Sequence, residues 1–89
     1  MKDINLLSGH LPGFILEYRD KKGIISKISS ILAENDINIA NIRVDRVGEI
    51  ATMICELDSS LDKATIVQLS DFEELISARF YDPDEERER

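Results

Sequence analysis

The feature that most constrains the fold is a short amphipathic helix between two segments of alternating polarity. Five large aliphatic residues recur at helical spacing with polar residues on the opposite side: Ile24, Ile25, Ile28, Ile31 and Leu32. Because an α-helix repeats every 3.6 residues, this spacing predicts a helix of about three turns with one face against a core. Asn35 and Asp36 come next, and both residue types tolerate the positive φ of a helix exit.

The segments on both sides of this helix alternate between apolar and polar residues, which predicts strands. The first strand covers residues 14–19 and directs Phe14, Leu16 and Tyr18 toward the core. In the strand after the helix the inward set is Ala40, Ile42 and Val44. Ile37 and Ile39 are out of phase with that set, so we expect a bulge near Ile39.

The second half of the chain repeats this order. Val47-Gly48-Glu49 is typical of a hairpin turn, and a strand over about Ile50–Leu57 follows it. Its inner face would carry Ala51, Met53, Cys55 and Leu57. A second helix is expected over Leu61–Leu69, with its N-cap among Asp58-Ser59-Ser60 and with Asp62 completing a capping box with Ser59. The secondary structure of Asp71–Leu75 is ambiguous from the sequence. A last strand then directs Ile76, Ala78 and Phe80 inward and ends before Pro83.

This order of elements predicts a ferredoxin-like βαββαβ sandwich of the α+β class. Its four strands would form one antiparallel sheet with two helices on one face. With 89 residues the chain has room for one domain. We expect that domain over residues 14–81, after a lead-in segment (1–13) and before an acidic solvated tail (82–89). The open face of the sheet would carry Glu17, Arg19, Asn41, Arg43, Arg79 and Tyr81.

The acidic composition excludes two classes of partner. The net charge is −7, of which the tail contributes −3 through five acidic and two basic residues, which leaves −4 on the body. An acidic body disfavours binding to nucleic acid and to anionic membranes, since both bind positively charged protein surfaces. No apolar run approaches the roughly 18 residues that span a bilayer, and the start lacks signal-peptide character. We therefore expect a cytoplasmic location.

The sequence contains few residues that could act in catalysis or bind a metal ion. Cys55 is the only cysteine and lies among apolar neighbours, so we expect an inert core thiol and neither a disulfide nor a cysteine-ligated metal. His10 is the only histidine and lies in the lead-in. No spacing pairs a nucleophile with a base. We expect no catalytic residues, no metal, no cofactor and no enzyme activity of the domain on its own.

The loop before the first helix is the candidate ligand site. The amides of Gly23, Ile24 and Ile25 lie at the positive end of the helix dipole and suit a carboxylate. Asp20 is placed to meet an ammonium group, so the loop would receive a zwitterion; alternatively, Asp20 merely caps the helix. Asn38 and Asn41 on the second strand either make ordinary hydrogen bonds at the sheet edge or, in the case of Asn38, complete the site across a dimer interface.

The stretch RDKKGIISKISSILAENDINIANIRVDR resembles the core of ACT domains: an Asp- or Asn-x-Pro-Gly turn, an aliphatic helix and a short Asn-Ile strand start. The later IATMICELD and SARFYD match the third and fourth strands of that family, so the resemblance covers roughly Phe14–Tyr81. INLLSGHLPGFILEYRDKKG is similar to the approach to the ACT domain in bacterial iron–sulfur L-serine dehydratases. The serine-sensing ACT domain of phosphoglycerate dehydrogenases is also similar.

The resemblance implies a regulatory domain that pairs side by side into an eight-stranded sheet and binds an amino acid at the interface. L-Serine is the favoured ligand, and the implied partner is a catalytic domain or subunit such as that of L-serine dehydratase. The implied ligand-binding residues are Tyr18, Asp20, Gly23, Ile24, Ile25, Asn38 and Asn41. Lys22 replaces the family's proline, so this turn is less rigid. The alternative is a pure oligomerisation domain that binds no ligand.

Overall fold

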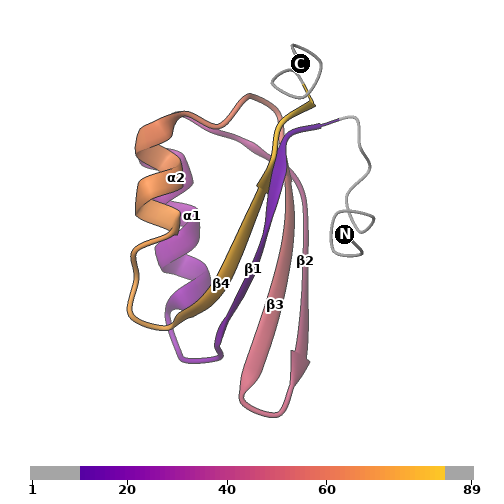
Figure 1. Cartoon of the computed structure of the whole chain (residues 1–89), viewed down its shortest axis with the longest axis vertical. Coiled ribbons are helices and arrows are strands. Elements are labelled where there is room, and N and C mark those ends of the chain that lie inside the picture. Colours follow the sequence, from indigo (N-terminus) through magenta and orange to yellow (C-terminus); the bar gives the residue numbers. More distant parts are fainter. Residues whose placement is uncertain (1–10, 84–89) are drawn as a thin grey trace.

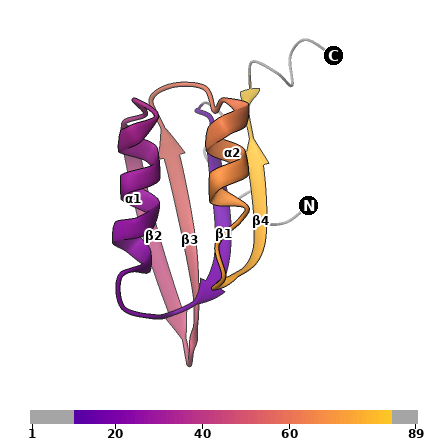
Figure 2. The ribbon, with the colours of Figure 1, turned by 90° about the vertical axis from the view of Figure 1, so that its left-hand side faces the viewer.

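Four strands and two helices follow one another in the order βαββαβ in the computed structural model, which describes residues 11–83 (Figure 1). The elements are β1 (Gly13–Arg19), α1 (Ile24–Glu34), β2 (Ile39–Val47), β3 (Ile50–Leu57), α2 (Lys63–Leu69) and β4 (Leu75–Tyr81). The strands form one antiparallel sheet in the order β2-β3-β1-β4. Both helices lie on the same face of this sheet (Figure 2), which confirms the predicted ferredoxin-like α+β fold.

The hydrophobic core lies between the helices and the sheet. Helix α1 buries Ile24, Ile28 and Leu32. The two central strands contribute the buried residues Phe14, Leu16, Tyr18, Ala51, Met53, Cys55 and Leu57. These are the inward-facing residues that the period of two predicted for β1 and β3. Each large apolar side chain that is fully buried stabilises the fold by about 1.5–3 kcal/mol.

Three local predictions are confirmed at the turns around β2. Asp36 follows α1 with a φ of 59°, next to the C-cap residue Asn35. The β2–β3 pairing shifts register between Ile39 and Asn41, which is the expected bulge. A two-residue turn at Gly48 and Glu49 joins β2 to β3, with a φ of 61° at Gly48.

The predicted start of the second helix is wrong. Helix α2 begins at Lys63, and its N-cap is Asp62, whose carboxylate accepts a hydrogen bond from the Thr65 N–H at 2.7 Å. An aspartate at this position reaches the amide three residues on, so no earlier serine is needed as a cap. Leu61 precedes the cap and packs against the core, as an apolar residue commonly does at that position.

The predicted inward set of the last strand is also wrong in part. Ala78 and Phe80 pack against the core, but Ile76 is 47% exposed and Leu75 packs in its place. The β1–β4 pairing shifts register between Glu17 and Tyr18, so Tyr18 pairs with Leu75. Because side chains alternate along a strand, this irregularity changes which residues face inward. The ambiguous Asp71–Leu75 stretch contains the turn that leads into β4.

Strand β2 lies at an edge of the sheet, and its residues are largely exposed. Ile42 and Val44 have the predicted inward phase, yet Ile42 remains 39% exposed because the edge is incompletely covered. The predicted inward position of Ala40 is wrong: Ala40 lies at the bulge and is exposed, and Ile39 packs against the core instead. On the open face, Asn41 and Arg43 pair with Glu56 and Ile54 of β3.

The predicted lead-in is described only from residue 11, and the predicted tail only to residue 83. His10 lies outside this range. Between these limits no helix has the length and apolarity needed to cross a membrane.

Candidate functional site

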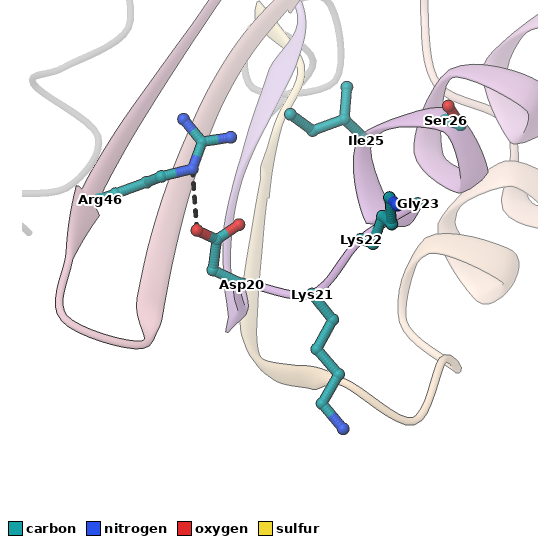
Figure 3. A pocket seen from close by; sticks show the side chains of 7 residues that line it. All are labelled: Asp20, Lys21, Lys22, Gly23, Ile25, Ser26 and Arg46. Carbon is teal, nitrogen blue, oxygen red and sulfur yellow. Dashed lines mark hydrogen bonds and ion pairs between the residues drawn. The ribbon is translucent and has the colours of Figure 1, made fainter.

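A cleft of about 340 Å³ opens between the β1–α1 loop and the end of β2 (Figure 3). It is lined by Asp20, Lys21, Lys22, Gly23, Ile25, Ser26 and Arg46. The loop and the β2–β3 hairpin meet here because the Asp20 N–H donates to the Glu49 carbonyl at 2.9 Å. The volume falls at the lower end of the range of about 300–1,000 Å³ typical of small-molecule sites.

One wall of the cleft is the start of α1, which has no side-chain cap. Its N-cap is Gly23, whose φ of 89° is readily adopted by glycine. The Ile24 N–H donates to the Lys21 carbonyl at 3.3 Å. The next two amides, of Ile25 and Ser26, find no acceptor within residues 11–83. The amides at the positive end of this helix are therefore available to an anionic group.

The opposite wall carries an ion pair that connects the loop to β2. Arg46 Nε donates to Asp20 Oδ2 at 2.9 Å, with the two side chains 50% and 26% exposed, respectively (Figure 3). Asp20 is thus held by an arginine across the cleft and does not cap α1, so the alternative reading of Asp20 as a helix cap is wrong. Lys21 and Lys22 add two more cationic side chains to the lining.

Arg46 was not among the sequence-predicted site residues. A signal for it was present, because Arg46 continues the phase of Ile42 and Val44. The register confirms this phase by pairing Arg46 with Ala51, which belongs to the core. Because side chains alternate along a strand, Arg46 lies on the helix-covered face of the sheet. A charged side chain on that face needs a polar partner, and this need was the signal for Arg46.

Tyr18 is fully buried and is not one of the residues that line the cleft. Its hydroxyl has no hydrogen-bond partner among residues 11–83. Burial raises the pKa of Tyr18, while the charge of Arg46 opposes that rise and the charge of Asp20 adds to it. The phenol therefore lies within electrostatic range of the ion pair, although its ring belongs to the core.

The remaining predicted residues lie in different places. The Ile24 side chain is buried in the core, so only its backbone belongs to the loop. Asn38 precedes β2, and its carbonyl accepts from the Asp58 N–H at 3.0 Å. Asn41 Nδ2 donates to Glu56 Oε1 at 3.4 Å. Eight residues of extended chain separate Asn38 from Arg46, roughly 25 Å, so one chain does not bring the two asparagines to the cleft.

The family model of the ACT domain matches residues 14–74 of this chain. The chain belongs to the ACT family. The match spans β1 to the turn before β4, and it includes the whole β1–α1 loop and the full length of β2.

Two relatives from Bacillus subtilis (strain 168) share this ACT domain's sequence at modest identity. A probable L-serine dehydratase, beta chain, is 32% identical over 72 residues, which cover 79% of this chain and 33% of the relative. D-3-phosphoglycerate dehydrogenase is 31% identical over 77 residues, or 84% of this chain and 14% of the relative. The chain therefore spans about a third of the first relative and a smaller part of the second.

Solved structures share the fold of this ACT domain. The C-terminal domain of the MgtC protein from Mycobacterium tuberculosis superimposes with a TM-score of 0.63 at 20% identity, covering 85% of this chain and 90% of that one. The ACT domain from GTP pyrophosphokinase of Chlorobium tepidum gives 0.60 at 22% identity, with coverage of 80% and 84%. At these identities the likeness concerns the fold alone.

The thiol of Cys55 has no part in the cleft of this ACT domain. Cys55 is fully buried, and burial raises its pKa to about 12, with the charge of Glu56 adding to the rise. A thiol with so high a pKa stays protonated at neutral pH, and it is the thiolate that reacts. Within residues 11–83, no group of three or more histidine, cysteine, aspartate or glutamate residues is placed to hold a metal ion.

Proposed function

We propose that this ACT domain is a sensor of a free amino acid, with L-serine as the first candidate. The observation that supports the proposal is that the Asp20 carboxylate and the uncapped start of α1 line the same cleft. The two groups attract opposite ends of a zwitterion. Asp20 Oδ1 has no partner within residues 11–83 and suits an ammonium group, while the Ile25 and Ser26 amides suit a carboxylate.

Tyr18 contributes from beneath the cleft. Its buried hydroxyl has no partner in the described part of the chain, and an unsatisfied buried donor costs about 1–3 kcal/mol. A polar group of a ligand that reaches this hydroxyl beside the Asp20–Arg46 pair would supply the missing hydrogen bond. The need for that partner favours a small polar ligand over an apolar one.

The site is completed by a second copy of the chain. Edge strand β2 has the cleft at its C-terminal end and Asn38 just before its first residue. If two β2 strands pair antiparallel, the partner's Asn38 approaches the cleft, and Asn41 lies within the new interface. Ile42 and Val47 are 39% and 80% exposed on this strand, and a partner strand would cover part of that apolar surface. Such pairing yields a continuous sheet of eight strands.

Ligand bound across that interface would favour one arrangement of the dimer over others. A partner catalytic domain or subunit could respond to that shift, and the effect is allosteric because the two sites are distinct. The similarity to a protein named as an L-serine dehydratase beta chain makes such an enzyme the first partner to test. We propose that residues 14–81 form this regulatory unit in the cytoplasm and that it has no catalytic activity of its own.

A pure assembly domain is the second candidate. The exposed apolar side chains of edge strand β2 favour this function, because their burial would stabilise a dimer with or without a ligand. The two functions differ in one measurable respect. An assembly domain gains no stability from an amino acid.

The deciding experiment is a thermal-shift titration of the full chain against the twenty amino acids, beginning with L-serine, followed by calorimetry. A ligand that binds only the folded state stabilises it by about 2.7 kcal/mol when its concentration is a hundred times Kd. A saturable shift for one amino acid supports the sensor. No shift for any amino acid, in a chain that light scattering shows to be dimeric, would leave the assembly domain.

A further inference from the structure

We propose that Arg46 binds the ligand: its terminal amino groups hold the amino acid's carboxylate while its Nε keeps Asp20 oriented toward the ammonium group. This inference rests on the proposed amino-acid sensor and adds to it a residue that sets specificity. It predicts that the site requires a free carboxylate, so that the amide of the same amino acid is rejected.

The geometry of the ion pair leaves Arg46 ready for this role. A guanidinium has five N–H donors, of which only the Nε–H is used here, at 2.9 Å from Asp20 Oδ2. The two terminal amino groups have no partner within residues 11–83. Figure 3 shows them on the side of the guanidinium away from Asp20, and the Ile25 side chain extends from α1 toward that side. Two parallel N–H groups in this position match the two oxygens of a carboxylate.

The same contact leaves Asp20 half occupied. Oδ2 accepts from Arg46, and Oδ1 accepts from no group within residues 11–83. The Asp20–Arg46 pair therefore presents one free anionic oxygen and two free cationic amino groups to the same cleft. These are the complements of an ammonium group and a carboxylate separated by one carbon, as in an α-amino acid.

The charge of the cleft supports a carboxylate-bearing ligand. Arg46, Lys21 and Lys22 line the cleft together with one carboxylate, that of Asp20, in a chain whose net charge is −7, and the Lys21 side chain extends away from Asp20 (Figure 3). The Ile25 and Ser26 amides add partial positive charge from the opposite wall. An amine without a carboxylate would leave this excess positive charge uncompensated, whereas a zwitterion places its negative group against it.

Arg43 offers a matched control on the same strand. It is 58% exposed, against 50% for Arg46, and its Nε lies 4.0 Å from Asp45 Oδ2. The register pairs Arg43 with Ile54, which faces the open side of the sheet, and pairs Arg46 with the core residue Ala51. The two arginines thus share strand, exposure and ion pairing but lie on opposite faces.

The test is calorimetry on the full chain with L-serine and L-serinamide, using wild type, Arg46→Gln and Arg43→Gln. Should L-serine not bind, the amino acid with the largest thermal shift and its amide take the place of this pair. We expect wild type and Arg43→Gln to favour the acid over the amide by at least tenfold. In Arg46→Gln we expect affinity for the acid to fall at least tenfold and the preference over the amide to shrink below threefold. Arg46→Lys keeps the charge without the paired donors, so its affinity should lie in between.

Each other outcome has a separate meaning. If Arg46→Gln binds the acid as tightly as Arg43→Gln, Arg46 is not a ligand-binding residue. The same conclusion follows if it loses the acid and the amide equally, because that is the mark of general damage to the site. If folded wild type binds none of the twenty amino acids, the sensor function itself fails. Size-exclusion chromatography and melting temperature of every variant exclude unfolding, and Arg46→Lys serves if Arg46→Gln does not fold.

Discussion

The two helices of this ACT domain begin in different ways, although each follows a strand and packs on the same face of the sheet. The N-cap of α2 is Asp62, whose carboxylate accepts from the Thr65 amide at 2.7 Å. The N-cap of α1 is Gly23, which has no side chain to offer, and no other side chain within residues 11–83 caps this helix. One helix start is satisfied within the chain, and the other leaves amides free beside a cleft.

The difference separates a stabilising helix start from one available for binding. An aspartate at an N-cap is the usual solution and stabilises the helix. Asp20 lies close to α1 in sequence and has the right chemistry for a cap, yet it pairs with Arg46 of β2. The loop thus leaves the α1 amides uncapped and keeps a carboxylate in the cleft. The following predictions test whether this start is built for a ligand.

The largest effect is expected from Asp20→Ala. This variant removes the carboxylate proposed to meet the ammonium group, and a hydrogen bond to a charged group is worth about 1.5–3 kcal/mol. We therefore expect amino-acid affinity to fall by roughly 10- to 150-fold in calorimetry. Stability should change little, since exposed ion pairs contribute about 0–1 kcal/mol. Asp45→Ala, which removes the partner of Arg43 on the open face, should leave affinity unchanged; equal losses in both variants would contradict the assignment.

Gly23→Ala tests the backbone of the α1 start. A Cβ at Gly23 meets no atom within 4 Å, so the cost arises from the φ of 89° alone. We expect urea unfolding to show a loss of about 1–2 kcal/mol, and amino-acid binding to weaken as the loop relaxes. Gly48→Ala is the control: its φ of 61° brings a similar strain, but Gly48 is not part of the cleft. Binding that weakens equally in both variants would mean that stability, not the loop, controls affinity.

Tyr18→Phe is expected to change stability and binding in opposite directions. Removing a buried hydroxyl that lacks a partner should raise the free energy of unfolding by about 1 kcal/mol. If the ligand supplies that partner, the same variant should bind the amino acid several-fold more weakly. Urea unfolding without ligand and calorimetry with ligand measure the two effects separately. Unchanged affinity would remove Tyr18 from the site and leave it as a core residue.

Most of the fold could be predicted from the sequence because local signals agree with the packing. The aliphatic spacing of α1 and the alternation in β1 and β3 predict most of the residues that pack in the core, with the exception of Ile25, which is 38% exposed and lines the cleft. The errors occur where tertiary pairing overrides local pattern. The register shift opposite Tyr18 brings Leu75 inward in place of Ile76, and no feature of residues 75–81 alone signals it.

The candidate site was less predictable for a related reason. Asp20 and Gly23 were identified because they flank a helix start, which is a local feature. Arg46 lies 26 residues after Asp20, so their contact depends on the hairpin that brings the end of β2 beside the loop. The proposed role of Asn38 needs a second copy of the chain, and the sequence pattern of one chain does not predict where that second copy lies.

The smallest effect is expected at the start of α2. Hydrogen bonding by Thr65, whose N–H donates to Asp62 Oδ1 at 2.7 Å, lowers the pKa of Asp62. A lowered folded-state pKa gives stability that is present above the unfolded value of about 3.9 and is lost as pH falls through the folded value. Asp62→Ala should therefore be less stable than wild type at pH 7, with the difference shrinking below about pH 4.

Asp62→Asn sharpens this last test because asparagine is also a good N-cap but does not titrate. We expect Asp62→Asn to unfold near the wild-type urea midpoint at pH 7 and to lack the component of the pH dependence that Asp62 contributes. Amino-acid affinity should be the same in both Asp62 variants as in wild type, because Asp62 does not line the cleft. A change of affinity in either variant would mean that the start of α2 is coupled to the ligand site, and the contrast between the two helix starts would then fail.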